Sequence, residues 1–209
     1  MKTRVMVVDD HASVRQMLGA LLPGVGAFEM VAEAGTGLEA IQTLRREKPN
    51  LVVLDLALPE LNGVGLLQHL RLEAREVRTL VYSGTVNREM ILGALRARPH
   101  GFVLKKEPWS TFREALRMVN AGCCYFTPFA TRLLDESGPT GSSITLTPRE
   151  SAVLQMVAEG RSNKEMATQL SISAKTVEHH RSHVMVKLGV HDVAGLTRYA
   201  VRQGLVALD

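Results

Sequence analysis

Five polar residues stand where short apolar runs of the sequence come to an end. Asp9 and Asp10 end the first run, Asp55 ends the third, and Ser83 and Lys105 end the fourth and fifth. If these runs are parallel strands, their carboxyl ends meet at one edge of a sheet, which is where ligands of such sheets bind. Crowded carboxylates repel one another, and a hard divalent cation relieves that repulsion through oxygen ligands. We therefore expect a Mg²⁺ site at this edge.

The same residues predict phosphoryl chemistry. A carboxylate can attack a phosphoryl group when a cation, a basic side chain and a hydroxyl bind the transferring oxygens. Lys105 and Ser83 are the candidates for the last two. Asp55 is the best candidate for the nucleophile, because it ends the third run and Asp9 and Asp10 end the neighbouring first. One strand-end aspartate alone is more often a helix cap, but five coordinated polar strand ends favour a site.

The elements that must position these residues alternate along the first part of the chain. Segments with helical periodicity separate the apolar runs, and this alternation predicts a doubly wound α/β domain with a parallel sheet and helices on both faces. The five predicted strands are Arg4 to Val8, Glu29 to Ala34, Leu51 to Leu56, Thr79 to Tyr82 and Gly101 to Leu104.

The chain changes character after Thr127-Pro128. One short helix is expected at Phe129 to Leu134, and the Gly-, Ser- and Pro-rich stretch Glu136 to Ser143 is typical of a linker. Beyond it the sequence predicts only helices, four in number, with dense start and stop signals. These are capping boxes at Thr147/Glu150 and Ser162/Glu165, further N-caps at Ser173 and Asp192, and stops at Gly160, Gly189 and Gly204.

The second and third of these helices are separated only by residues 171–173, a turn of helix-turn-helix length. The third helix, Ala174 to Leu188, carries three basic residues against Glu178, so it alone accounts for the excess of +2 in the helical region. A basic helix of this kind can enter the major groove of DNA. His179 and His183 are spaced for one helix face, but no third ligand accompanies them, and DNA contact or capping is preferred to metal binding.

Composition limits the remaining possibilities. With 45% hydrophobic and 22% charged residues, the chain is expected to be globular. It has neither a signal peptide pattern nor an apolar stretch near the roughly 20 residues that cross a bilayer, so we expect a cytoplasmic protein without membrane contact. The net charge of +4 is shared evenly and does not by itself argue for DNA. Cys123 and Cys124 end the fifth helix, where we expect buried thiols.

The first part of the chain resembles the receiver domain of bacterial response regulators. The stretches that carry the resemblance are Val7 to Asp10, Leu54 to Pro59 with Gly63, Tyr82 to Gly84, and Gly101 to Lys105. It implies a (βα)5 flavodoxin-like fold and phosphorylation of Asp55 by a sensor histidine kinase. It also implies Mg²⁺ held by Asp10, Asp55 and the backbone carbonyl of Ala57, with Asp9 acting through water.

The receiver resemblance has two further consequences. It implies that Ser83 moves toward the phosphoryl group and that Phe102 is the aromatic switch residue. The sequence departs from the usual pattern at Arg98-Pro99-His100, where a stretch of the Ala-Gly-Ala type usually closes the fourth helix. This departure affects the expected shape of the fourth helix, which belongs to the usual signalling face.

Residues 146–206 resemble the LuxR-type domain of the NarL/FixJ family. The residues that carry this resemblance are Leu146 to Glu150, Val153-Leu154, Ala158 to Gly160, Asn163 to Glu165, Ala167, Leu170, Ser173, Lys175 to Val177, His180, Lys187 to Gly189 and Leu196. By position, the residues expected to contact bases are Glu178, His179 and Ser182. The residues expected to contact phosphates are Lys175, Thr176, Arg181 and Lys187.

Together these resemblances predict a receiver at residues 1–121, a connecting segment with a short helix at 122–145, and a DNA-binding domain at 146–209. The implied function is phosphorylation-controlled regulation of transcription, without enzymatic activity. The expected partners are a sensor histidine kinase and double-stranded DNA, to which the protein is expected to bind as a homodimer on inverted half-sites. RNA polymerase is a further candidate partner. If the domains dock, we expect the receiver to cover the recognition helix.

Two other functions are compatible with parts of the sequence. One is a phosphorylation-independent DNA-binding protein whose receiver serves only for dimerisation. The other is an enzyme, either a phosphatase with an aspartate nucleophile or a dehydrogenase, because Gly35 to Ala40 fits the dinucleotide-binding pattern GxGxxA and Asp55 follows about 20 residues later. The glutamates of the preceding run suit an edge strand better than the central strand that carries this pattern, which argues against the dehydrogenase.

Overall fold

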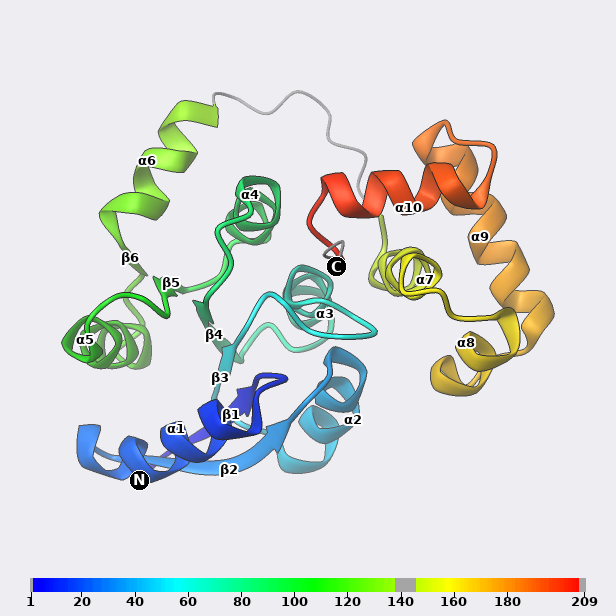
Figure 1. Ribbon diagram of the computed structural model, residues 1–209. Coiled ribbons are helices and arrows are strands. Elements are labelled where there is room, and N and C mark those ends of the chain that lie inside the picture. Colours follow the sequence, from blue (N-terminus) through cyan, green and yellow to red (C-terminus); the bar gives the residue numbers. More distant parts are fainter. Residues whose placement is uncertain (1, 138–145, 207–209) are drawn as a thin grey trace.

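The computed structural model describes residues 2–137 and 146–206, which form an α/β domain followed by a helical domain (Figure 1). The first domain alternates strands and helices as the sequence predicts. Its elements are β1 (Thr3–Val8), α1 (Ala12–Val25), β2 (Phe28–Ala34), α2 (Gly37–Glu47), β3 (Leu51–Leu54), α3 (Gly63–Glu73), β4 (Arg78–Ser83), α4 (Arg88–Arg96), β5 (Gly101–Leu104), α5 (Trp109–Asn120), β6 (Tyr125–Phe126) and α6 (Pro128–Ser137).

The strands form one parallel sheet in the order β2-β1-β3-β4-β5-β6. This confirms the doubly wound prediction, and β2 is the edge strand that its glutamates indicated. The sheet has one strand more than predicted, because Tyr125 and Phe126 pair with β5. Two residues are too few to show a periodicity, so the sequence carried little signal for β6.

Side chains of the central strands alternate between two cores. Val5 and Val7 pack under α1 and α5, whereas Met6 and Val8 pack under α2, α3 and α4. Because successive side chains of a strand point to opposite faces, strands buried on both faces must be apolar throughout, and β3 is buried at every position. The polar residues of these strands are therefore confined to their ends.

The GxGxxA pattern has a structural explanation at its second glycine. Gly37 begins α2, with Thr36 as the N-cap. A Cβ atom on Gly37 would lie 1.9 Å from the carbonyl oxygen of Leu61, so only glycine lets the loop after β3 pass so close.

The helical domain contains α7 (Pro148–Ala158), α8 (Asn163–Leu170), α9 (Ala174–Leu188) and α10 (Val193–Arg202). All four begin at predicted caps: both capping boxes are formed, and the Ser173 and Asp192 side chains accept from backbone N–H groups. Gly189 ends α9 in the left-handed conformation at φ +65°. The helix-turn-helix of α8 and α9 is thus confirmed.

Three predictions lie around the connection between the domains. The short helix is confirmed and extends to Pro128–Ser137, packing against α4 through Ala130 and Leu133. Of the predicted linker, Glu136 and Ser137 belong to the end of α6, and the rest lies outside the described residues. The expectation of buried thiols is wrong. Cys123 and Cys124 are both exposed, because α5 has already ended and the chain turns at Gly122, which has φ +85°.

Across residues 2–137 and 146–206, no helix combines the length and the apolar character that a membrane span needs.

Candidate functional site

The predicted polar strand ends meet at one edge of the sheet. Asp9 follows β1, Asp55 follows β3, Ser83 ends β4 and Lys105 follows β5. The pairing of β1 with β3 and of β4 with β5 brings these ends together. Asp9, Asp55 and Ser83 are 2%, 4% and 0% exposed. Buried polar and charged side chains need nearby partners, and each of these three residues has one.

Lys105 binds both buried carboxylates. Its Nζ atom lies 2.7 Å from Asp9 Oδ2 and 2.5 Å from Asp55 Oδ2. Burial alone would lower the pKa of Lys105, but the two carboxylates outweigh it and raise the pKa above the usual value. Lys105 is therefore a permanent cation beside Asp55, as charge stabilisation of a phosphoryl group requires.

The other carboxylate oxygen of Asp55 is held by the loop that follows it. Oδ1 accepts hydrogen bonds from the backbone N–H of Leu56 at 2.6 Å and, more weakly, of Ala57 at 3.3 Å. The Ser83 hydroxyl also donates to Oδ1 in a very short hydrogen bond. The receiver resemblance implied that Ser83 moves toward a phosphoryl group, and in the structure its hydroxyl is already hydrogen-bonded to Asp55.

The oxygen ligands of this edge fit a hard cation. Asp10 is 38% exposed at its side chain and lies next to Asp9, and the two form with His11 a cluster of groups able to hold a metal ion. The His11 ring Nδ1 lies 2.7 Å from Asp10 Oδ1, and the His11 backbone N–H donates to Asp9 Oδ1. The predictions did not include His11, although its position beside Asp9 and Asp10 was a signal. Mg²⁺ prefers carboxylate oxygens as ligands, and the exposed carboxylate of Asp10 leaves space for the ion.

The predicted switch residue lies inside the domain. Phe102 on β5 is 0% exposed and packs in the core beneath α2, α3 and α4. Its strand neighbours β4, which ends in Ser83. Phe102 and Ser83 thus both point inward.

The loop that begins at Asp55 continues into a contact between the two domains. Gln155 of α7 is 1% exposed, and its side-chain amide accepts from the Asn62 backbone N–H at 2.8 Å and donates to the Leu58 carbonyl at 2.7 Å. Glu60 also takes part, since its backbone N–H donates to Glu159 and its carboxylate accepts from Gln169 of α8. The residues just after Asp55 are therefore bound directly to the helical domain.

Apolar packing strengthens this contact. Leu61, which belongs to the loop, is 1% exposed and lies in the core cluster of the helical domain with Leu154 and Met156, and Leu38 and Ile41 of α2 pack against the same cluster. Sequence reasoning missed both Leu61 and Gln155. A signal existed for Gln155, which interrupts the apolar run of residues 153–157 and is buried instead of facing solvent.

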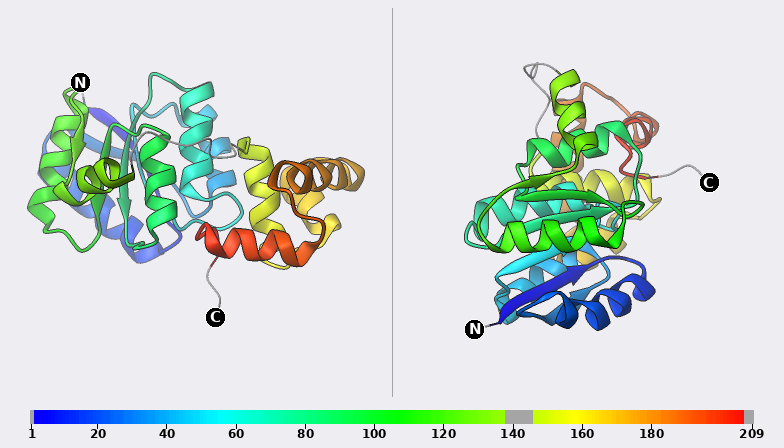
Figure 2. Two further views of the ribbon diagram at one scale, coloured as in Figure 1. Left: turned by 90° about the horizontal axis from the view of Figure 1, so that it is seen from above. Right: turned by 90° about the vertical axis from the view of Figure 1, so that its left-hand side faces the viewer.

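The receiver does not cover the recognition helix, contrary to expectation. Figures 1 and 2 show α7 between the first domain and α9, with α9 on the far side. The expectation is wrong because docking uses α7, which packs on α3, together with α8 through Gln169. Five predicted DNA contacts are exposed, namely Lys175, Glu178, His179, Ser182 and Lys187.

Several of the predicted phosphate-contacting residues have partners within the helical domain. Arg181 donates to the Asn163 side chain at 2.6 Å, and Thr176 shares a hydrogen bond with Ser173. The Lys187 ammonium lies 2.7 Å from the carboxylate of Glu150 in the capping box of α7. Arg181 and Lys187 thus tie α9 to α8 and α7, and set the angle at which α9 is presented.

Glu150 is 5% exposed and depends on that ion pair. Burial alone would raise its pKa, but hydrogen bonds from Lys187 and Thr147 outweigh this and lower the pKa of Glu150 below the usual value. The imidazole rings of His179 and His183 lie on the exposed face of α9 with their centroids 4.2 Å apart, in a tilted arrangement with an interplanar angle of 46°. No acidic or cysteine partner completes a metal-ligand cluster there among the described residues.

Comparison with known proteins agrees with this geometry. Residues 5–117 match the family described as response regulator receiver domain, and residues 144–200 match the bacterial regulatory proteins of the luxR family. The chain belongs to the NarL/FixJ family of response regulators. It therefore has a receiver and a LuxR-type DNA-binding domain, as the transcriptional regulators among its relatives do.

Relatives of this response regulator extend over its whole length. It is 33% identical to a putative transcriptional regulator of Pseudomonas aeruginosa over 98% of this chain and 100% of that one. It is 31% identical to the virulence regulator BvgA of Bordetella pertussis, with the same coverage. Among solved structures, RcsB of Salmonella enterica bound to the promoter rprA with phosphomimetic BeF3⁻ is similar, with a TM-score of 0.60 and 25% identity over 95% and 98% of the two chains. The response regulator ChrA of a haem-sensing two-component system has a TM-score of 0.55 and 29% identity over 98% and 99% of the two chains.

Proposed function

We propose that this response regulator binds double-stranded DNA under the control of phosphorylation at Asp55 by a sensor histidine kinase. One observation carries the proposal. The carboxylate of Asp55 is held by Lys105 on one oxygen and by Ser83 on the other, and the loop that leaves it is hydrogen-bonded to α7. The proposal includes the division into a receiver at 1–121, a connection at 122–145 and a DNA-binding domain at 146–209.

In the transfer step, an oxygen of Asp55 forms a bond to phosphorus while the bond from phosphorus to the kinase histidine breaks. Lys105 stays protonated and binds a phosphoryl oxygen, and the Ser83 hydroxyl donates to another. Asp10, Asp55 and the Ala57 carbonyl, with Asp9 acting through water, would hold Mg²⁺, which would supply positive charge to neutralise the phosphoryl oxygens. We propose no catalytic turnover for this chain beyond slow loss of the acyl phosphate.

The phosphoryl group disturbs the loop because it competes for the groups that now bind Asp55. Leu56 and Ala57 donate to the carboxylate in the present arrangement, and the bonds to α7 begin only one residue further on, at Leu58. A shift of the loop therefore weakens the contact with Gln155. Phosphorylation then acts as a population shift from docked to separated domains, with Phe102 and Ser83 as the inward switch residues.

The DNA-binding part of the proposal rests on α9. The exposed side chains of Glu178, His179 and Ser182 are the proposed base contacts, and Lys175, Thr176, Arg181 and Lys187 are the proposed phosphate contacts. The similarity to RcsB, solved on promoter DNA, supports this role. We further propose a homodimer on inverted half-sites, a contact with RNA polymerase, and a place in the bacterial cytoplasm, where the chromosome is.

The test is DNA selection with and without phosphorylation. The full chain is incubated with acetyl phosphate and Mg²⁺, mass spectrometry measures the phosphoryl group, and bound genomic fragments are sequenced. Asp55→Asn is the control. We expect phosphorylation of the wild type alone, with tighter binding to a shared inverted repeat. If the wild type takes up no phosphoryl group, Asp55 is not the acceptor and the proposal fails.

A second candidate function is favoured by the exposure of α9 in the docked arrangement. Because docking leaves the recognition helix uncovered, the chain has the surface it needs for DNA without any phosphorylation. In this case the receiver is a dimerisation module. The same experiment distinguishes the two: equal binding of wild type and Asp55→Asn to the same fragments, with and without acetyl phosphate, supports the second function and contradicts the first.

A further inference from the structure

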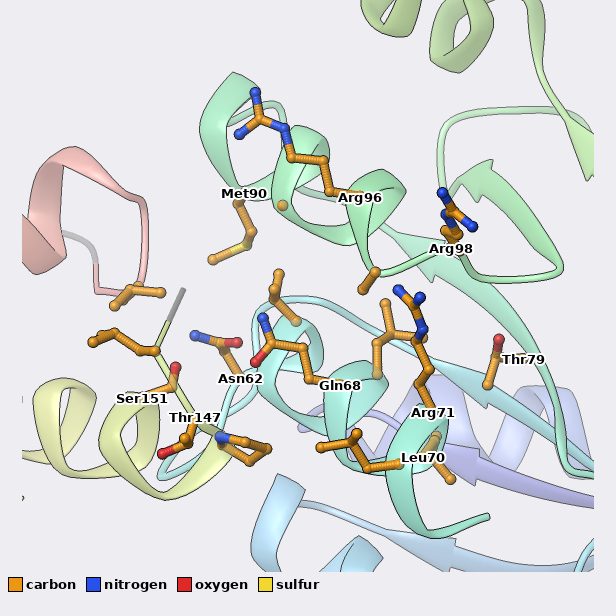
Figure 3. A pocket seen from close by; sticks show the side chains of 18 of the residues that line it. Asn62, Gln68, Leu70, Arg71, Thr79, Met90, Arg96, Arg98, Thr147 and Ser151 are labelled. Carbon is orange, nitrogen blue, oxygen red and sulfur yellow. The ribbon is translucent and has the colours of Figure 1, made fainter. Parts of the chain in front are cut away.

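A cavity of about 790 Å³ lies between the two domains. It is lined by α3 and α4 of the receiver and by α7 and α10 of the DNA-binding domain (Figure 3). This volume falls within the range of pockets that bind small molecules. Neither the phosphoryl chemistry nor the DNA contacts use it.

The lining is strongly basic. Among the described residues that line the cavity, one is acidic, Glu89, and four are arginines, namely Arg71, Arg75, Arg96 and Arg98. Within the part of the chain that the structure describes, none of the four arginines forms an ion pair. Figure 3 shows the Arg71 side chain extending from α3 toward Arg98, whereas Arg96 extends over the other side of α4. Arg71 and Arg98 therefore concentrate positive charge at one end of the cavity, where an anion is attracted.

The backbone at Arg98 adds an independent observation. Arg98 has φ +57°, in the left-handed region that glycine adopts without strain. This is the segment where the sequence departs from the usual closure of the fourth helix, with Arg-Pro-His in place of a glycine-containing stretch. Strained residues of this kind concentrate at functional sites. Here the strained backbone conformation places the guanidinium group of Arg98 at the edge of the cavity.

The opposite end of the cavity holds an unpartnered donor. Asn62 is 1% exposed; its side-chain oxygen caps α3 by accepting from Gly65, but its buried Nδ2 has no hydrogen-bond partner within the described residues. Leaving a buried amide donor unpaired is unfavourable. Figure 3 shows the Asn62 amide near Ser151 and Gln68, whose side chains also form no hydrogen bond among the described residues. These groups can bind polar atoms of a ligand.

The middle of the cavity is apolar. Val64, Met90, Leu154 and Tyr199 contribute side chains from all four helices. We propose that the cavity binds a small organic anion, which has an apolar body and a phosphate, sulfonate or carboxylate group, with the anionic group between Arg71 and Arg98. Because such a ligand contacts both domains, its binding stabilises their docked arrangement. The proposal does not depend on phosphorylation of Asp55.

The test titrates the full chain with 8-anilinonaphthalene-1-sulfonate, which joins an aromatic body to one sulfonate, and follows its fluorescence. We expect saturable binding of one probe per chain, weakened at least tenfold by Arg71→Gln combined with Arg98→Gly. The matched control is Arg113→Gln combined with Arg132→Gln, two exposed arginines on α5 and α6, which leaves binding unchanged. The neutral analogue N-phenyl-1-naphthylamine is expected to bind at least tenfold more weakly than the sulfonate.

NMR locates the probe. With ¹³C-labelled methionine methyl groups, we expect the probe to shift the resonance of Met90, which lines the cavity, but not that of Met118, which is on α5. Circular dichroism melting checks that the variants are folded. If the double variant is not folded, the single variant Arg71→Gln replaces it in the titration. The proposal is overturned if the arginine variants bind like the control, if the neutral analogue binds equally well, or if Met90 does not respond.

Discussion

Shortening Leu61 to alanine should release the DNA-binding domain from the receiver. Leu61 belongs to the receiver, yet its side chain is 1% exposed because it fills the core of the other domain. Replacing a buried leucine by alanine costs about 2–5 kcal/mol. The loop can relax to fill part of the space, so we expect about 2–3 kcal/mol. When the domains separate, residue 61 is exposed in both the wild type and Leu61→Ala. The substitution therefore lowers the free energy of docking by this amount. The docking equilibrium constant should drop roughly 30- to 140-fold.

Single-molecule energy transfer measures this constant. One fluorophore is attached at Cys123, which is exposed, in a Cys124→Ser background, and the second at Ser182→Cys on α9. The matched control is Leu72→Ala, because Leu72 on α3 is 61% exposed and its loss should change docking little. Circular dichroism establishes that each variant is folded. If Leu61→Ala keeps the wild-type ratio of docked to separated molecules, the loop does not hold the domains together, and the coupling to Asp55 that depends on it is refuted.

Three further substitutions test the reasoning at single positions. Gly37→Ala should destabilise the receiver by more than about 3 kcal/mol in urea unfolding, because its Cβ would collide with the Leu61 carbonyl; an unchanged midpoint would contradict the close approach. The pKa of Glu150 is lowered by Lys187, so its contribution to stability is present above the usual carboxyl pKa and is lost as the pH falls through the lowered value. Wild type should thus lose stability in acid more steeply than Glu150→Gln when melting temperatures are compared across pH. Arg98→Gly should raise the free energy of unfolding by about 0.5–1 kcal/mol by relieving the positive φ, and a clear destabilisation would refute strain at this residue.

The docked arrangement bears on how such a regulator is switched. The exposure of α9 means that contact with the receiver does not prevent DNA contact by covering the recognition helix. Docking instead fixes α7 on α3 and so limits where the recognition helix of each copy can lie. For a dimer that must reach two half-sites, this limit is itself a form of control. Release of Gln155 and Leu61 would then free the placement of α9 and leave its surface unchanged.

Much of the fold followed from local signals in the sequence. Strands buried on both faces must be continuous apolar runs, and strands β1 to β5 begin and end within two residues of the predicted ones. Helix starts in the second domain were predicted for a similar reason, since a cap is satisfied by side chains three residues away, as with Thr147 and Glu150. The approach of Asp55 to Lys105 was also predictable, because parallel strands of one sheet end at the same edge.

What remained hidden depended on contacts between distant segments. The sequence by itself determined the two domains, the polar strand ends and the basic third helix, because each rests on periodicity, capping or strand topology. Only the tertiary structure decided that Leu61 leaves its own domain, that Gln155 is buried against the loop, that Cys123 is exposed and that α9 faces away from the receiver. The physical reason is that a side chain's burial depends on which surfaces meet, and here the surfaces come from domains some hundred residues apart, with Leu58 and Gln155 separated by 97 positions.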